Sequence, residues 1–284
     1  MSFTAVFSRN RWALPINSEG LKMEIYYLIS AYILAGVFGL CVGSFLNVVI
    51  YRLPNNMNLA KPDSHCPVCK YKLKWYDNIP ILSYIILGGK CRSCKTHISF
   101  RYTAVEIANM LMWLLSALLF WKTNIPLACI YAAVSSIFIC IFFIDLEHKI
   151  ILDRFQLMLL ALGIAAIFFD KDFPWTSHVI GGVLGFLVFF FVGWAYEISH
   201  DREGLGGGDI KLAGVVGLLL GWERMLLALL VASVPAAIIM LALTRGKNGE
   251  NKEFPFAPFL VSGFSVAMFF GTPIINWYVS LLGL

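Results

Sequence analysis

The stretch Gly206-Gly207-Gly208-Asp209 places a carboxylate directly after three glycines, at the edge of a hydrophobic segment. An ionisable side chain at a membrane boundary is costly, so it marks a candidate functional site. A second carboxylate, Asp145, ends another apolar run in the same way. Whether these edges are membrane boundaries depends on the rest of the chain.

The overall composition predicts an all-α polytopic membrane protein. Of 284 residues, 59% are hydrophobic and only 14% are charged, whereas soluble domains are about one-quarter charged. The lipid bilayer is therefore an expected partner. The net charge of +5 is small and unevenly placed, so we expect no nucleic-acid partner and interpret the basic stretches as loops beside a membrane.

The apolar runs predict about eight transmembrane helices. The clear runs cover residues 25–50, 105–121, 125–144, 179–196, 225–243 and about 259 to the C-terminus, and two shorter runs cover 155–169 and 210–222. The first run is too long for the hydrophobic part of a cleavable signal peptide, so we expect it to remain as an anchor. The expected divisions are an N-terminal tail (1–24), a first transmembrane helix (25–52), a four-cysteine domain (53–102) and a seven-helix membrane domain (103–284).

The distribution of basic residues predicts the orientation. Nine Lys and Arg residues lie between Arg52 and Arg101, and cytoplasmic loops are the ones enriched in these residues. We therefore expect the four-cysteine loop in the cytoplasm and the N-terminus outside. Three basic residues in the N-terminal tail weakly oppose this orientation.

The loop after the first span contains two C-x-x-C pairs, Cys66-Pro67-Val68-Cys69 and Cys91-Arg92-Ser93-Cys94. Two such pairs about twenty residues apart have the spacing of a four-thiolate zinc site. The loop has too few apolar residues for an ordinary core, and a bound metal replaces one. Two disulfides are the alternative, which a reducing cytosol disfavours.

Asp145 and Asp209 are expected at the same face of the membrane. Two predicted spans lie between them, and two crossings return the chain to the side that it left. Neighbouring carboxylates share a proton, so the ionised one can activate water while the protonated one polarises a peptide carbonyl. Read singly, Asp209 fits a helix cap and Asp145 fits a polar loop with Glu147 and Lys149 nearby.

Other polar and small residues in the apolar runs are expected to be structural. Asn47 fits a hydrogen bond between helices, and Glu106, just inside a span, is expected to pair with Arg101. Small residues four positions apart favour close helix contacts. The pairs with this spacing are Gly39 with Gly43 and Gly181 with Gly185.

Together these segments resemble the type IV prepilin peptidases, GxGD-type aspartic proteases of the bacterial inner membrane. The matching segments are 43–54, the two cysteine pairs, 78–83, 98–102 with Glu106, 144–145 with Asp153, and 206–212. Two segments depart from the family pattern: Ile151-Leu152-Asp153 stands where Leu-Pro-Asp is usual, and Pro255-Phe256-Ala257-Pro258 stands where Pro-Phe-Gly-Pro is usual.

The resemblance implies a function and a set of site residues. Family members remove a short basic leader from type IV prepilins or the pseudopilins of type II secretion, cutting after a glycine just before the apolar pilin helix. Many then methylate the new N-terminal amine with S-adenosylmethionine. The implied catalytic residues are Asp145 and Asp209, and the four cysteines are the implied zinc ligands.

Two other classes of function remain open from the residues alone. One is a membrane transporter with a zinc-dependent regulatory loop, because membrane acids often couple to protons. The other is a non-enzymatic scaffold for pilus or secretion assembly, with the zinc loop as a docking platform. The scaffold predicts that an Asp145→Asn change is silent, whereas the protease predicts loss of cleavage.

Overall fold

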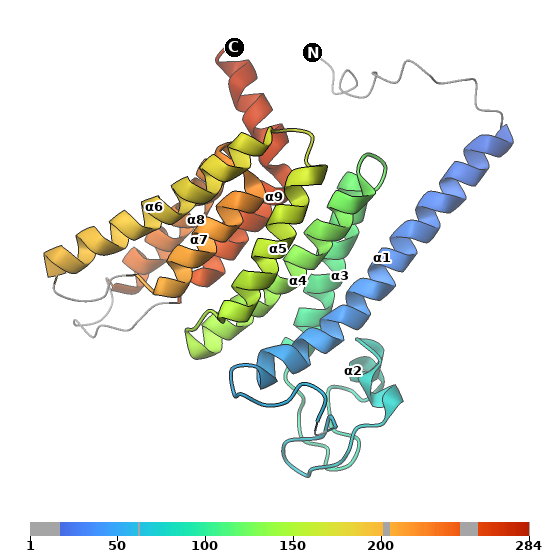
Figure 1. Cartoon of the computed structure of the whole chain (residues 1–284). Helices are drawn as coiled ribbons and strands as arrows, with labels where there is room; N and C mark the ends of the chain where they lie inside the picture. Colours follow the sequence, from blue (N-terminus) through green and yellow to red (C-terminus); the bar gives the residue numbers. More distant parts are fainter. Residues whose placement is uncertain (1–17, 62, 201–204, 245–254, 284) are drawn as a thin grey trace.

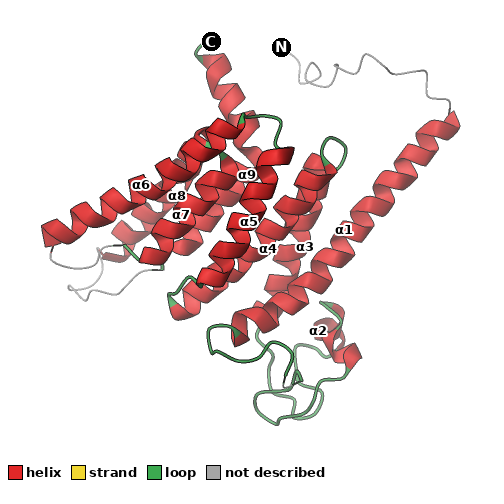
Figure 2. Cartoon of the chain, in the orientation of Figure 1, coloured by secondary structure: helices red, strands yellow, loops and turns green. Residues whose placement is uncertain are grey.

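A computed structural model describes residues 18–61, 63–200, 205–244 and 255–283. In these ranges every regular element is a helix, and only two isolated bridges, His65 with Lys72 and Lys90 with His97, have strand-like pairing. Figure 2 shows the helices and the loops that connect them. The expected all-α fold class is confirmed.

The helices that form the bundle are labelled in Figure 1. They are α1 (Ser18–Arg52), α3 (Arg101–Phe120), α4 (Ile125–His148), α5 (Asp153–Phe169), α6 (Trp175–His200), α7 (Gly207–Leu220), α8 (Trp222–Thr244) and α9 (Ala257–Leu281), with the short η2 (Trp75–Asn78) and α2 (Leu82–Ile86) between α1 and α3.

Six of these helices are long and apolar enough to cross a membrane: α1, α3, α4, α6, α8 and α9. The protein is therefore a multi-pass membrane protein. Helix α5 has 17 residues and α7 has 14, fewer than the roughly 20 that a perpendicular crossing needs. That these two also cross the bilayer stays a prediction.

Several helices extend beyond the apolar runs from which they were predicted. Helix α1 begins at Ser18, inside the stretch assigned to the N-terminal tail, with Glu19 in its first turn, where a negative charge is favourable. Helix α4 continues to His148. Asp145 therefore lies in a helical turn and not in a polar loop, which corrects the interpretation of that residue.

Helix α4 forms the centre of the bundle. It packs against α1, α3, α5 and α9, and Figure 1 shows it between α3 and α5. Tyr131 and Ile141 of α4 are almost fully buried, as are Leu212 of α7 and Phe264 of α9. These contacts fix the positions of the last turn of α4 and the first turns of α7 and α9.

Glycines allow two pairs of helices to approach closely. A Cβ at Gly39 would lie 2.9 Å from the Met110 backbone, and one at Gly43 would lie 2.8 Å from Glu106 Cα. Helices α1 and α3 can therefore pack this closely only because these two positions carry no side chain. Gly181 and Gly185 of α6 likewise meet the backbone of α7. The packing role predicted for these glycines is confirmed.

Hydrogen bonds from two side chains also hold α1 and α3 together. Asn47 Nδ2 donates to the Tyr102 carbonyl at 3.0 Å, as expected for a bond between helices. Asn109 Nδ2, fully buried, donates to the Gly39 carbonyl at 2.7 Å. Both bonds satisfy polar groups that would otherwise be costly inside a bilayer.

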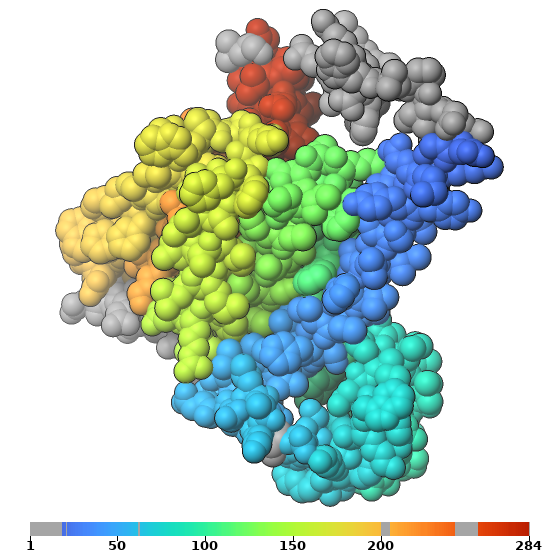
Figure 3. Space-filling model, turned by 45° about the vertical axis from the view of Figure 1, so that its right-hand side comes forward, coloured from blue at the N-terminus to red at the C-terminus, as the bar shows by residue number. Residues whose placement is uncertain are grey.

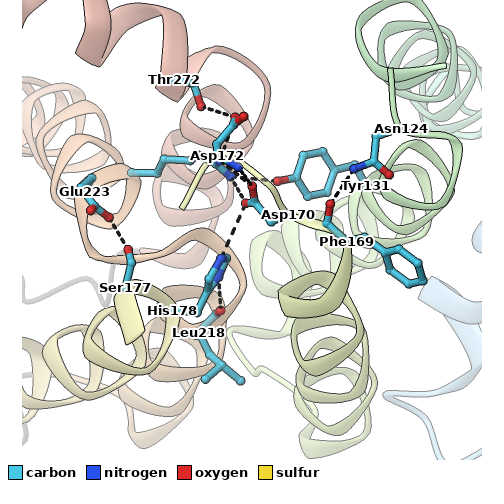
Figure 4. A network of polar contacts seen from close by, with 11 residues as sticks. Asn124, Tyr131, Phe169, Asp170, Asp172, Ser177, His178, Leu218, Glu223 and Thr272 are labelled. Atoms are coloured by element: carbon cyan, nitrogen blue, oxygen red, sulfur yellow. Dashed lines mark hydrogen bonds and ion pairs between the residues drawn. The ribbon is translucent and has the colours of Figure 1, made fainter. Parts of the chain in front are cut away.

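A buried polar network, drawn in Figure 4, lies at the beginning of α8 and the turn between α5 and α6. The guanidinium of Arg224 donates to Asp170 Oδ2 at 2.8 Å and to the Tyr131 hydroxyl at 3.0 Å. His178 Nε2 lies 3.7 Å from Asp170 Oδ2. Asp172, also bonded to Arg224, accepts a hydrogen bond from Thr272 of α9. The network joins α4, α6, α8 and α9.

The four-cysteine domain forms a separate lobe beyond the C-terminal end of α1, coloured pale blue to cyan in Figure 3. Arg52 Nη1 donates to the Asn58 and Leu59 carbonyls at 3.1 and 2.9 Å. On the other side, the Ile81 N–H donates to Glu106 Oε2 at 2.8 Å. The expected pairing of Glu106 with Arg101 is therefore wrong, because Arg101 pairs with Glu147 of α4.

Candidate functional site: a carboxylate pair and a four-cysteine cluster

Asp145 occupies the last turn of α4, where its side chain is buried. Its Oδ2 accepts a hydrogen bond from the backbone N–H of Ala257, the first residue of α9, at 3.2 Å. Lys149 ends the helix in the left-handed conformation, with φ of 53°, and its N–H donates to the Asp145 carbonyl. Asp145 thus holds the beginning of α9 against the end of α4.

Asp209 lies in the first turn of α7, after Gly206 at the N-cap. Its Oδ1 is buried and has no hydrogen-bond partner among the described residues. A Cβ at Gly206 would lie 3.3 Å from Asp209 Oδ2, and one at Gly208 would lie 3.1 Å from Ile151 Cβ, whereas Gly207 borders open space. Two of the three glycines therefore give room to close neighbours, and the third has no described neighbour within 4 Å.

The structure brings Asp145 and Asp209 to the same end of the bundle. Helices α4 and α7 both pack on α5, and the two carboxylates are close enough for the charge of Asp145 to act on Asp209. The intervening α5 and α6 run to the other end of the bundle and back (Figure 1). This geometry agrees with the argument from an even number of spans.

A residue that the sequence analysis missed supports the glycine turn. Gln156 of α5 is buried, and its Nε2 donates to the Gly208 carbonyl at 3.1 Å. The signal available in the sequence was a lone amide inside the apolar run 155–169. Asp153, by contrast, points to the surface, where its carboxylate is paired with Lys211 at 2.9 Å.

The four cysteines of the lobe come together as one cluster. The four Sγ atoms of Cys66, Cys69, Cys91 and Cys94 lie within 4.8 Å of one another. Cys66 and Cys94 are 3.8 Å apart, and Cys69 and Cys91 are 3.9 Å apart. A tetrahedral ion with Zn–S bonds of about 2.3 Å requires sulfurs about 3.8 Å apart, whereas a disulfide requires about 2.0 Å. The cluster therefore fits a metal ion and not two disulfides.

At two of the four cysteines the surroundings also favour the thiolate, the form that binds metal. Hydrogen bonding with the Thr96 hydroxyl lowers the pKa of Cys94 to about 6. Backbone N–H groups of Cys69 and Val68 lower the pKa of Cys66. His65 and His97 are not needed as ligands, because four sulfurs complete the tetrahedron.

An ion pair with one buried partner, Asp77, supports the second cysteine pair. Arg92 Nε donates to Asp77 Oδ1 at 2.7 Å, and the Asp77 side chain is only 1% exposed. Burial alone would raise the pKa of Asp77, but the bonds from Arg92 and from the Lys74 N–H hold it below its usual value. The pair joins η2 to the residues between Cys91 and Cys94.

Fold and site together define a polytopic membrane protein with two carboxylates at the same end of its bundle and a four-cysteine cluster in a lobe beyond α1. Two family models match the chain: the Bacterial Peptidase A24 N-terminal domain over residues 37–123 and the Type IV leader peptidase family over residues 132–241. No solved structure matches.

Curated relatives agree with the family models. A prepilin leader peptidase/N-methyltransferase of Burkholderia pseudomallei is 34% identical over 263 residues, 84% of each chain. Proteins of the same name from Pseudomonas aeruginosa and Legionella pneumophila are 32% and 34% identical, over 89% and 87% of this chain and 95% and 94% of theirs. The chain belongs to the type IV leader peptidase family, as its motifs led us to expect.

Proposed function

We propose that this protein cleaves the leader peptide from type IV prepilins or pseudopilins and then methylates the new N-terminal amine. The observation that carries the peptidase is the position of Asp145 and Asp209, from α4 and α7, at the same end of a membrane bundle. Family membership supports both reactions, since the relatives carry both in their name.

We assign different roles to the two carboxylates from their hydrogen bonds. Asp145 accepts a backbone N–H, which favours its ionised form, so it takes the proton from the attacking water. Asp209 has a buried oxygen without a partner and carries the shared proton, which polarises the scissile carbonyl and then passes to the leaving amine. The products are a leader with a new carboxylate and a pilin with a new amine.

The substrate fits this position if the lobe faces the cytoplasm, which the basic residues between Arg52 and Arg101 support. A prepilin has a basic leader that stays in the cytoplasm and an apolar helix that lies in the bilayer. Its scissile bond is therefore at the boundary, where Asp145 and Asp209 lie. We place the protein in the bacterial inner membrane.

We further propose that the four cysteines hold a structural zinc ion. The lobe has only short helices, so an ion held by both cysteine pairs replaces a hydrophobic core. Zinc content measured by mass spectrometry should be one ion per chain and should be lost in a Cys66→Ser, Cys94→Ser variant. S-adenosylmethionine, when bound, would supply the methyl group.

The test is to incubate the purified protein with a full-length prepilin and S-adenosylmethionine and then weigh the product. We expect the mass to fall by that of the leader and to rise by one methyl group. An uncut prepilin would refute the peptidase. A cut but unmethylated product would refute the second reaction alone.

A transporter is the weaker alternative. Transport sites usually lie near the middle of the bilayer, whereas both carboxylates lie at helix ends. Proton flux through liposomes that disappears with Asp145→Asn would favour that alternative.

A further inference from the structure

An apolar groove opens beside the carboxylate pair, between α6 and α8. Its walls include Val188 and Val192 of α6 and Leu229 and Ser233 of α8, and it encloses about 230 Å³. Val192 is 59% exposed, and Ser233 is also exposed. The Ser233 hydroxyl donates to the Leu229 carbonyl of its own helix, so the groove presents an almost wholly apolar lining.

Two residues that line the groove are the chain neighbours of residues at the carboxylate site. Phe256, which lines it, precedes Ala257, whose N–H holds Asp145. Leu205, which also lines it, precedes Gly206 and the turn that carries Asp209. An apolar segment in this groove would therefore have one end beside both carboxylates.

The groove also lies on the side of the bundle that a membrane-bound substrate can reach. In Figures 1 and 3, α6 lies on the side away from α1 and the four-cysteine lobe. Apart from the groove residues, α6 exposes large apolar side chains such as Phe190 and Phe191, as expected of a helix that faces lipid. A helix diffusing in the bilayer can enter from this side without displacing the lobe.

We propose that the groove between α6 and α8 is the docking site for the apolar helix of the prepilin, immediately after the scissile bond. This inference rests on the proposed function and adds the surface that selects the substrate. The volume of the groove suits the side chains along one face of a helix and not a whole helix. One face of the substrate helix therefore enters the groove, and the rest of that helix stays outside it. Because the lining offers no charged partner, a charged residue at the facing positions of the substrate would be rejected.

Photocrosslinking tests the contact directly. Benzoylphenylalanine replaces Val192, or in a control Val183, which is 55% exposed on the same helix but outside the groove. Both variants carry Asp209→Asn, so that prepilin stays uncut and the result is independent of cleavage. We expect a crosslink to the apolar segment of the prepilin from position 192 and not from 183. Equal crosslinking at both positions, or none at 192, would overturn the docking site.

Kinetics give a second, independent measurement in the active protein. We expect Val192→Trp to fill the groove and raise KM for prepilin about tenfold with little change in kcat, while Val183→Trp behaves as wild type. Identical KM values for the two variants would overturn the proposal. If wild type and Val183→Trp both leave prepilin uncut, the proposed peptidase function fails instead.

Discussion

The carboxylates of Asp145 and Asp209 differ in their hydrogen-bond partners. The Ala257 N–H fixes one oxygen of Asp145, while one buried oxygen of Asp209 has no partner in the described part of the chain. An unsatisfied buried polar atom is rare in a folded protein and needs an explanation; for Asp209 we propose that the missing partner is a reacting group. This asymmetry is the physical basis for giving the two carboxylates separate roles.

At the same scale, we expect Gln156→Leu to lower kcat about ten- to a hundredfold, because the Gly208 carbonyl loses its donor and the turn before Asp209 shifts. KM for prepilin should change little. Steady-state kinetics in detergent measure both constants. Leu157→Ala, at an exposed position of the same helix, is the control and should keep the wild-type activity. An unchanged kcat in Gln156→Leu would show that Gln156 does not support the site.

The lobe should respond to acid through Asp77. Its pKa is lowered in the folded state, so its bond with Arg92 stabilises the lobe above the usual carboxyl pKa, about 4. That stability is lost only as the pH falls through the lower folded value. Zinc retention should therefore be weaker in Asp77→Asn than in wild type at pH 7. A dye that binds released zinc measures the difference, and an equal release at pH 7 would contradict this role.

At the scale of the element, α7 is the helix that positions Asp209, and its contact with α6 sets that position. The carbonyl of Ala213 faces Gly185 so closely that a Cβ there would overlap it. The sequence predicted this contact from the spacing of two glycines. It could not predict which helix would be the partner, because spacing identifies a face and not what packs on it.

We expect Gly185→Ala to push α6 and α7 apart, destabilise the protein by about 1–3 kcal/mol and reduce prepilin cleavage. Gly163→Ala is a matched control, since a Cβ there would lie 3.6 Å from its nearest neighbour, an ordinary contact. Thermal unfolding in detergent and cleavage assays distinguish the two. Equal melting temperatures for both variants would contradict the packing argument.

The apolar runs predicted the helices correctly, but the helices begin and end at other residues than the runs do. Helix α4 continues through Asp145 to His148, and α1 begins before the apolar run. Helix formation depends on backbone hydrogen bonds and caps as well as hydrophobicity, so polar residues can continue a helix beyond the membrane. The short α5 and α7 were recognised as helices, but apolar length alone does not determine whether they cross.

At the scale of the whole molecule, the two ends of the bundle have different structures. One end carries the carboxylates and the lobe, and the other carries the network around Arg224 (Figure 4). The sequence does not reveal that Arg224 is buried. The partners of a single Arg cannot be predicted from the residues around it, and Asp170 lies more than fifty residues away in sequence.

We expect Arg224→Met to destabilise the protein by about 3–5 kcal/mol, because it leaves the buried Asp170 carboxylate without its partner. The change lies at the end of the bundle away from the carboxylate pair. Lys122→Ala, which breaks an exposed pair with Glu24 at 3.9 Å, is the control and should cost less than about 1 kcal/mol. Chemical unfolding in detergent measures both; equal losses would refute the structural role of the network.

The cysteine cluster and the parity of the spans were predictable because each depends on counting residues or crossings. The side chains around the site were not, because Gln156, Ala257 and Phe256 come from segments distant in sequence. Their positions depend on packing among α4, α5, α7 and α9. This is why the groove beside the carboxylates became visible only in three dimensions.

The most direct test of the carboxylate pair is to compare prepilin turnover by Asp145→Asn, Asp209→Asn and the double variant in one assay, with correct membrane insertion verified for each. Because the two groups act as a unit, each single change should reduce kcat about a thousandfold or more, and the double variant should be no slower than either. A single variant that keeps near-normal turnover, or losses that multiply in the double variant, would contradict the account.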